Sequence, residues 1–262
     1  MLPTFVVIGV LRGGTTSLSR YLGAHPQVFV ASQKEVHFFD KHFDEGLGWY
    51  ERQFQDAGTA RQAGEATPAY LYNDIAMQRL RATLPDAKLI VTLREPVERA
   101  YSHYWLLRAQ NRTDKDFEQA VREDPTHGWL ERGRYLRFLQ PLEAEREAGR
   151  LHVLLFEDLR DSPAETYAEI CRFLDIDDSV LPAVVGRQIN AYVAIRSMRV
   201  RRWSGRLPKQ LRDVVGRVNT SRVPYPSLDP ELAADLRAEF EEDNAALADW
   251  LGRDLSAWTE PP

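Results

Sequence analysis

The stretch Thr4–Ser17, TFVVIGVLRGGTTS, decides the fold class of this 262-residue chain. Its first part, Thr4–Val10, is a short apolar run rich in β-branched residues, which is typical of a buried parallel strand. Glycines follow, and then a helix that we predict over Thr16–Ala24. A strand that turns through glycines into a helix points backbone N–H groups and the positive end of the helix dipole at one spot, so the segment predicts an anion site.

The rest of the first 185 residues alternates predicted strands with predicted helices. Buried strands are expected at Lys88–Leu93 and Leu151–Phe156. Ser162–Glu165 has the pattern of a capping box, with Pro163 at the first helical position. Helices are expected at Leu47–Phe54, Ile75–Leu84, Val97–Ala109, Tyr135–Ala148 and from Ser162 to about Leu174. This alternation indicates an α/β protein of three α/β/α layers, with a central parallel sheet and a P-loop-like phosphate site.

The C-terminal part has a different composition. Arg196–Arg217 carries eight Arg or Lys residues, and Pro230–Leu251 has the pattern of one long acidic helix. We therefore predict one domain over residues 1–262, with an α/β core at 1–185 and a helical C-terminal cap at 186–262. The basic segment has three readings: a solvated helix face, a cover over a nucleotide, or a surface for an anionic acceptor.

Composition excludes several classes of protein. With 34 Lys and Arg against 39 Asp and Glu, the formal net charge is −5, which argues against a general nucleic-acid coat. The single cysteine, Cys171, excludes an intramolecular disulfide and lies in an apolar helical series, so we predict a buried core thiol. No apolar run reaches the roughly 20 residues of a membrane span, and no signal peptide is recognisable. We expect a cytoplasmic protein.

The first candidate site is the glycine loop. Gly9 and Gly14 have the spacing of a nucleotide triphosphatase loop, but Thr15 stands where that loop has its lysine. A permanent positive charge comes instead from Arg12. The site therefore looks built for an anion held by protein cations, backbone amides and hydroxyl groups, with no metal required. Its residues are Arg12, Gly13, Gly14, Thr15, Thr16 and Ser17.

A second anion pocket is predicted at the end of the strand Lys88–Leu93. Arg94 stands there, where a magnesium-holding aspartate would be expected in a nucleotide triphosphatase. Ser102 follows two helical turns into the next helix, and a strand-end arginine beside a helix N-terminus suits a phosphate. The alternative is a surface ion pair and a serine that faces its own helix. Two anion pockets indicate a nucleotide phosphorylated at two positions.

These residues carry a resemblance to sulfotransferases that use 3′-phosphoadenosine 5′-phosphosulfate (PAPS), closest to the heparan sulfate glucosaminyl 3-O-sulfotransferase branch. The similarity is dense over Phe5–Trp105, loose from there to Leu174, and weak beyond Val185. Its motifs are IGVLRGGTTSL (Ile8–Leu18), HPQV (His25–Val28), KEVHFFD (Lys34–Asp40), GLGWY (Gly46–Tyr50), ATPAY (Ala66–Tyr70), LIVTLREPVERAYSHY (Leu89–Tyr104) and GRY (Gly133–Tyr135).

The resemblance implies a role for each candidate residue. The loop Arg12–Ser17 would hold the 5′-phosphosulfate, and Arg94 with Ser102 would hold the 3′-phosphate. Glu35 would be the catalytic base, and the product nucleotide would be adenosine 3′,5′-bisphosphate. Further residues are assigned on the family pattern: His37, Asp40, Glu65 and Tyr70 beside the acceptor, Arg222 near the nucleotide, and Tyr135 near the nucleotide or the acceptor cleft, with nucleotide binding as its expected role. For Glu65, a strand-end carboxylate in a salt bridge is an equal alternative.

The chemistry of sulfuryl transfer agrees with a base in the KEVHFFD motif. In-line transfer needs a group that takes the acceptor proton and a site that stabilises charge on the leaving nucleotide. The apolar neighbours of Glu35 would raise the pKa of its carboxyl group, whereas Lys34 would lower it. His37 is the alternative base, because the ordinary pKa of histidine suits the task.

Two positions depart from the family pattern. Arg12 stands where the family usually has lysine, and a guanidinium group keeps the charge but cannot deliver a proton to the leaving phosphate. Ala66 stands where the glycan branch has a lysine suited to an anionic sugar, which together with the net charge argues against a heparan-like acceptor.

The sequence therefore predicts a PAPS-dependent sulfotransferase acting on a hydroxyl group, or an amine, of a small-molecule or sugar-containing acceptor. Two other functions stay open. One is a P-loop nucleotide-dependent kinase, against which the missing loop lysine and Arg94 speak. The other is a non-catalytic protein that binds a bisphosphate nucleotide, against which Glu35 and His37 speak, because binding alone needs no base. No feature indicates a particular oligomeric state.

Overall fold

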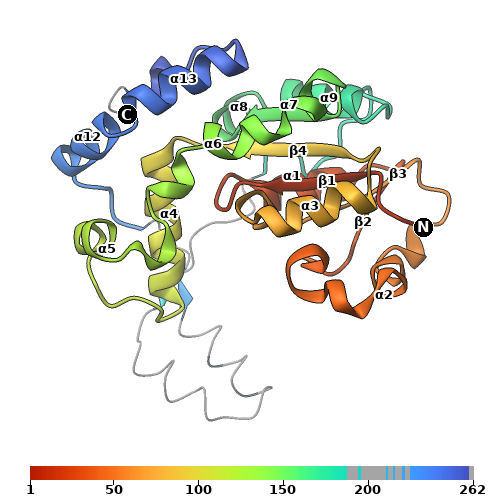
Figure 1. The fold of residues 1–262 in the computed structure, drawn as a ribbon, viewed down its shortest axis with the longest axis horizontal. Coiled ribbons are helices and arrows are strands. Elements are labelled where there is room, and N and C mark those ends of the chain that lie inside the picture. The colour runs from red at the N-terminus through yellow and green to blue at the C-terminus, as the bar shows by residue number, and fades with distance from the viewer. Residues whose placement is uncertain (188–193, 196–210, 212–214, 216–219, 222–224, 260–262) are drawn as a thin grey trace.

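The computed structural model describes residues 1–187, 194–195, 211, 215, 220–221 and 225–259. Its centre is a five-stranded sheet in the order β2-β3-β1-β4-β5, and every pair of neighbours is parallel (Figure 1). Helices flank the sheet, which confirms the predicted three-layer α/β/α fold. The strands are β1 (Phe5–Gly9), β2 (Val28–Val30), β3 (Gln62–Ala66), β4 (Lys88–Leu93) and β5 (Leu151–Leu155).

The strands alternate their side chains between two apolar layers. Val6 and Ile8 face a layer that includes helix α3 (Asp74–Thr83), whereas Phe5 and Val7 face one that includes α1 (Thr15–Gly23) and α9 (Pro163–Phe173). Burial on both faces explains why β1 and β4 read as nearly continuous apolar runs. Cys171 lies in the second layer and is buried, as predicted.

A third apolar cluster holds the first of the C-terminal helices against the rest of the domain. It joins α4 (Pro96–Ala109), α5 (Phe117–Glu123) and α12 (Pro230–Ala238). Figure 1 shows α12 and α13 (Glu241–Leu251), in blue, beyond the end of the sheet where α4 lies. Arg237 of α12 pairs with Glu95, the N-cap of α4, at 3.8 Å. Helix α12 therefore packs close to the end of β4, whereas Leu247 of α13 lies in the first apolar layer with Leu139 of the segment that follows α5. A short antiparallel pair, β6 (Ala194–Ile195) and β7 (Thr220–Ser221), completes the described strands.

Two helices that we expected to be continuous are interrupted. The range Tyr135–Ala148 forms α6 (Leu136–Leu139), a 3₁₀ turn and α7 (Glu143–Glu147), because Pro141 has no N–H for the helical ladder. The range Pro230–Leu251 divides into α12 and α13 at Phe240, whose ring is buried in the α4 cluster.

The predicted capping box is wrong, although its helix is present. The Ser162 side chain makes no capping hydrogen bond to α9, and Pro163 begins that helix. Strands β2 and β3 and helix α8 (Phe156–Asp161) were not predicted, while α2 (Leu47–Arg52) was. No helix in the described ranges is long and apolar enough to cross a membrane.

The strand order positions the site. From β1 the chain moves to β2 and β3 on one side of the sheet, and β4 continues to β5 on the other. Connections that diverge in this way leave a crevice at the carboxyl ends of the two central strands, which is where open parallel sheets bind ligands. The loop after β1 carries Arg12, and Arg94 directly follows β4.

Candidate active site

The loop after β1 has the geometry of an anion site. Gly14 is the N-cap of α1 with φ 90°, and it offers no side-chain cap to the helix. The first N–H groups of a helix lack α-helical acceptors. The Ser17 N–H donates to the Gly14 carbonyl at 2.9 Å, so the N–H groups of Thr15 and Thr16 are those that can reach a ligand. A Cβ on Gly13 would stand 2.4 Å from the carbonyl oxygen of Thr92, which explains the glycine. Thr15, Thr16 and Ser17 form the first turn of the helix, which begins one residue before the predicted start at Thr16.

Two cations converge on this loop from neighbouring strands. The Nε of Arg12 donates to the Ser102 hydroxyl at 2.9 Å, so the two predicted anion pockets adjoin each other. Arg94 lies over the Phe156 ring at 4.9 Å and pairs with Glu98 at 3.0 Å. Burial lowers the pKa of Arg12, and the positive charge of Arg94 lowers it further. An anion between the two guanidinium groups would relieve both effects, so the residues fit a ligand with several phosphate oxygens.

Tyr135 contacts the backbone directly after β4, beside the site. Its side chain is only 1% exposed, and its hydroxyl donates to the backbone carbonyl of Arg94 at 2.6 Å. The ring therefore holds the end of β4 and does not face a ligand, which is a different role from the direct nucleotide contact we expected. Arg222 lies outside the described residues, as does most of the basic segment 196–217.

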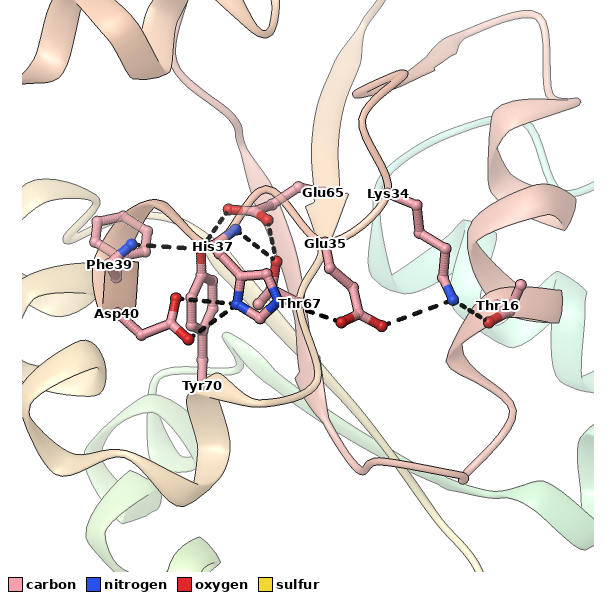
Figure 2. A network of polar contacts seen from close by, with 9 residues as sticks. All are labelled: Thr16, Lys34, Glu35, His37, Phe39, Asp40, Glu65, Thr67 and Tyr70. Atoms are coloured by element: carbon pink, nitrogen blue, oxygen red, sulfur yellow. Dashed lines mark hydrogen bonds and ion pairs between the residues drawn. The ribbon is translucent and has the colours of Figure 1, made fainter. Parts of the chain in front are cut away.

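The KEVHFFD motif forms a row of charged side chains that extends to Thr16 of the loop (Figure 2). The Nε2 of His37 lies 3.3 Å from Glu35 Oε2, and its Nδ1 lies 2.9 Å from Asp40 Oδ2. Each ring nitrogen thus faces a carboxylate, an arrangement that the doubly protonated imidazolium satisfies completely. Glu35 and His37 both have left-handed backbone conformations, with φ 58° and 55°. Such conformations cost roughly 1–3 kcal/mol each and persist only where surrounding contacts hold them.

This row decides the direction in which the pKa of Glu35 shifts. The sequence left the balance between apolar burial and Lys34 open, and the hydrogen bond from His37, which it did not indicate, outweighs burial and lowers the pKa of the carboxyl group. The same contact, with that of Asp40, raises the pKa of His37. The Glu35 side chain is 32% exposed. Glu35 is therefore an accessible carboxylate whose ionised form is favoured and which could accept a proton, whereas the contacts of His37 favour its protonated form.

Lys34 joins this row to the anion loop, and sequence reasoning did not select it. Its Nζ donates to the Thr16 hydroxyl at 2.6 Å and lies 3.7 Å from Glu35 Oε1. The signal was present, because Lys34 is the first residue of the KEVHFFD motif. Its ammonium group lies between the place where a phosphate would bind and the carboxylate that could serve as a base.

Glu65 and Tyr70 do not line an acceptor pocket as expected. Glu65 is 1% exposed and accepts hydrogen bonds from the hydroxyls of Tyr50, Thr67 and Tyr70 at 2.7, 2.6 and 3.2 Å. Burial raises the pKa of Glu65, against the lowering effect of these three donors. The Tyr70 ring is fully buried in the same layer. Glu65 therefore makes neither the acceptor contact that we expected nor the salt bridge that was its alternative, because its partners are hydroxyl groups.

The site therefore brings together a loop with the geometry of an anion site, two arginines and a carboxylate–imidazole–carboxylate row. Within the described residues, no group of three or more His, Cys, Asp or Glu side chains is arranged to hold a metal ion. That the reaction needs no metal stays a prediction.

The fold and the site together are those of a group-transfer enzyme. Residues 2–213 match the family model of the sulfotransferase domain, so the chain belongs to the sulfotransferase family. The resemblance found in the sequence motifs is thereby confirmed, including its relation to the heparan sulfate glucosamine 3-O-sulfotransferases.

Several characterised relatives illustrate the similarity. The membrane-associated sulfotransferase kil1 of Dictyostelium discoideum is 39% identical over 132 residues, which cover 47% of this chain and 28% of that protein. Mouse heparan sulfate glucosamine 3-O-sulfotransferase 3B1 is 30% identical over 182 residues, covering 67% of this chain and 46% of the relative. The chain thus spans about half or less of the length of these relatives.

Solved structures agree with the fold. A sulfotransferase from Alicyclobacillus acidocaldarius superposes with a TM-score of 0.76 at 26% identity, covering 99% of this chain and 100% of that one. The sulfotransferase domain from the curacin biosynthetic pathway has a TM-score of 0.58 at 15% identity and covers 97% of this chain and 99% of that one, a likeness of fold alone.

Proposed function

We propose that this sulfotransferase moves a sulfuryl group from PAPS to a hydroxyl group, or an amine, of a small-molecule or sugar-containing acceptor, with Glu35 as the base. The observation that carries the proposal is the position of Lys34. Its ammonium group contacts Thr16 of the anion loop on one side and Glu35 on the other. A carboxylate that can take a proton therefore lies next to the loop that would hold the donor.

The donor end of the site suits a nucleotide with two phosphate groups. The loop after β1 offers helix N–H groups and the Arg12 guanidinium to a 5′-phosphosulfate. Arg94 and Ser102, at the neighbouring strand end, would take the 3′-phosphate. The two pockets lie far apart in the sequence but adjoin each other in space, because Arg12 of the first donates to Ser102 of the second at 2.9 Å. This proximity supports one ligand that spans both pockets.

In the proposed reaction, Glu35 accepts the proton of the acceptor O–H group as its oxygen bonds to sulfur. The bond between sulfur and the bridging phosphate oxygen breaks, and the leaving adenosine 3′,5′-bisphosphate carries away the electron pair. Arg12 and Lys34 would stabilise the negative charge on the departing group. His37 is less suited as the base, because its two carboxylate contacts favour the protonated ring.

The acceptor is proposed to be less anionic than a heparan chain. Relatives are named for sulfation of heparan sulfate glucosamine, and these contribute the expectation of a sugar-like hydroxyl. In this chain Ala66, at the end of β3, is buried and carries no charge. The chain as a whole is acidic, with a net charge of −5, which disfavours a polyanion.

Thermal unfolding with adenosine 3′,5′-bisphosphate, and separately with ATP, each with and without Mg²⁺, tests the donor class. A ligand at about 100 times its dissociation constant stabilises a protein by about 2.7 kcal/mol. We expect a bisphosphate effect that does not depend on Mg²⁺, followed by PAPS-dependent sulfation in an acceptor screen. Stabilisation by ATP only with Mg²⁺ would contradict the proposal in favour of a kinase. Bisphosphate binding without turnover of PAPS would favour a non-catalytic binding protein.

A further inference from the structure

A buried carboxylate, that of Glu65, is linked by hydrogen bonds to the backbone of the KEVHFFD motif, Lys34–Asp40, which we call the catalytic segment. Glu65 lies near the end of β3, and its side chain is closed off from solvent and substrate. Its Oε2 accepts from the Thr67 hydroxyl at 2.6 Å, and its Oε1 accepts from the Tyr70 hydroxyl at 3.2 Å. Each of these hydroxyls accepts in turn from a backbone amide of the KEVHFFD motif, as Figure 2 shows.

The two relays reach the amides on either side of Phe38. The His37 N–H donates to Thr67 Oγ1 at 3.3 Å, and the Phe39 N–H donates to the Tyr70 hydroxyl oxygen at 3.4 Å. A hydroxyl group has one proton, so a hydroxyl that accepts from an amide must give its own proton elsewhere. Both give it to Glu65. One carboxylate thus fixes the direction of two hydrogen-bond chains that end on the catalytic segment.

The segment needs such a support. His37 has φ 55°, and the single π-helical turn Phe38–His42 begins directly after it. A left-handed conformation at a residue with a bulky side chain relaxes unless neighbouring contacts hold it. Relaxation at His37 would rotate its ring away from Glu35 and Asp40, the two carboxylates that it bridges.

We propose that Glu65 is a positioning residue for the sulfuryl transfer. Through the hydroxyls of Thr67 and Tyr70 it holds the His37 ring in hydrogen-bonding contact with Glu35. The inference rests on the proposed function, since it assigns to Glu65 the orientation of the proposed base and its partner. Glu65 itself touches neither acceptor nor donor.

Matched variants separate positioning from packing. Tyr70→Phe and Tyr50→Phe each remove one hydroxyl that donates to the same oxygen of Glu65. Only the Tyr70 hydroxyl also accepts from an amide of the catalytic segment. Thr67→Val removes the other relay and keeps the shape of the side chain. Glu65→Gln removes one acceptor oxygen, and it also removes a charge, so the neutral variants at Thr67 and Tyr70 carry the test.

The first readout is kinetic. We expect Thr67→Val and Tyr70→Phe to lower kcat by up to about 100-fold, the effect of displacing a reacting group by about 1 Å, with little change in KM for PAPS. Tyr50→Phe should keep kcat within about threefold of the wild type at a comparable loss of thermal stability. Equal losses of kcat in Tyr50→Phe and Tyr70→Phe would overturn the proposal, because the hydroxyls would then serve packing alone.

The second readout needs no turnover, so it separates failure of this proposal from failure of the proposed function. NMR titration of the His37 ring, assigned with His37→Gln, reports its contact with the carboxylates. The charged groups that influence the ring are Glu35, Asp40, Lys41 and Glu65. The pKa of His37 should lie above 6.5 in the wild type and in Tyr50→Phe, and fall in Thr67→Val and Tyr70→Phe. An unchanged His37 titration in both relay variants would refute the proposal even if the enzyme is active.

Discussion

The Lys34 ammonium group donates a 2.6 Å hydrogen bond to the Thr16 hydroxyl, and so connects the segment after β2 to the first turn of α1. The two segments are otherwise attached to different strands, one at the centre of the sheet and one at its edge. Because the same ammonium lies 3.7 Å from Glu35, its charge acts on both halves of the site.

Lys34→Gln should therefore slow the chemical step more than it weakens binding of the nucleotide. A hydrogen bond to a charged group contributes about 1.5–3 kcal/mol, and its loss predicts a fall in kcat of tenfold or more. Lys41→Gln is the matched control, because Lys41 is an exposed cation of the same motif region that also influences Glu35. Steady-state kinetics with PAPS would decide between them. Equal losses of kcat in the two variants would mean that positive charge near Glu35 affects the rate, and that the specific contact of Lys34 with Thr16 does not.

The second prediction concerns the guanidinium group in the anion loop. Arg12→Met should abolish most stabilisation by adenosine 3′,5′-bisphosphate and lower kcat by about 10²–10³-fold, the usual effect of removing one donor to a developing anion. Arg12→Lys keeps the charge but loses the Nε bond to Ser102. It should therefore retain part of the stabilisation by the bisphosphate and part of kcat. Calorimetric titration with the bisphosphate measures the binding effect directly. Undiminished binding by Arg12→Met would show that the loop amides alone hold the ligand.

The third prediction is a pH profile. The His37 contact lowers the pKa of Glu35 below its ordinary value of 4.5, so the ionised base is present above that pH and is lost only in more acidic solution. The acidic limb of kcat/KM, which reports the pKa of the free enzyme, should therefore lie below pH 4.5 in the wild type. In His37→Gln the lowering contact is absent, and the limb should move to higher pH. Its position would be followed in buffers of constant ionic strength, and a limb that stays in place would separate Glu35 from His37.

The fold, and the placement of Arg12 and Arg94 at the ends of two neighbouring strands, were predictable from sequence because their signals are local. An apolar β-branched run, glycines and a following helix lie within Thr4–Ser17, and Arg94 directly follows a similar run. Strand β3 escaped prediction because its five residues, QAGEA, include no β-branched or aromatic side chain. It forms by pairing with β1 and β2 on either side.

The role of Glu65 was not predictable for a related reason. Its partners Tyr50 and Tyr70 come from segments 15 residues before and 5 residues after it, and only the packed layer brings their hydroxyls to one carboxylate. Likewise, the lowered pKa of Glu35 depends on the left-handed turn that aims His37 at it. Composition around Glu35 indicated burial, whereas the orientation of one neighbouring ring decides the direction of the effect.

The final prediction concerns Tyr135, which supports the end of β4. Its buried hydroxyl donates to the Arg94 carbonyl at 2.6 Å, so Tyr135→Phe leaves a buried carbonyl without that donor. The expected loss is about 1–3 kcal/mol in the free energy of unfolding, measured by urea denaturation. Tyr72→Phe is the control, because its hydroxyl donates to the Arg132 carbonyl at 3.2 Å, away from the strand end. Both variants should lose stability, but only Tyr135→Phe should also weaken bisphosphate binding, since Arg94 follows the displaced backbone. If the two variants bound the bisphosphate with equal affinity, Tyr135 would contribute to the stability of the fold but not to the position of Arg94.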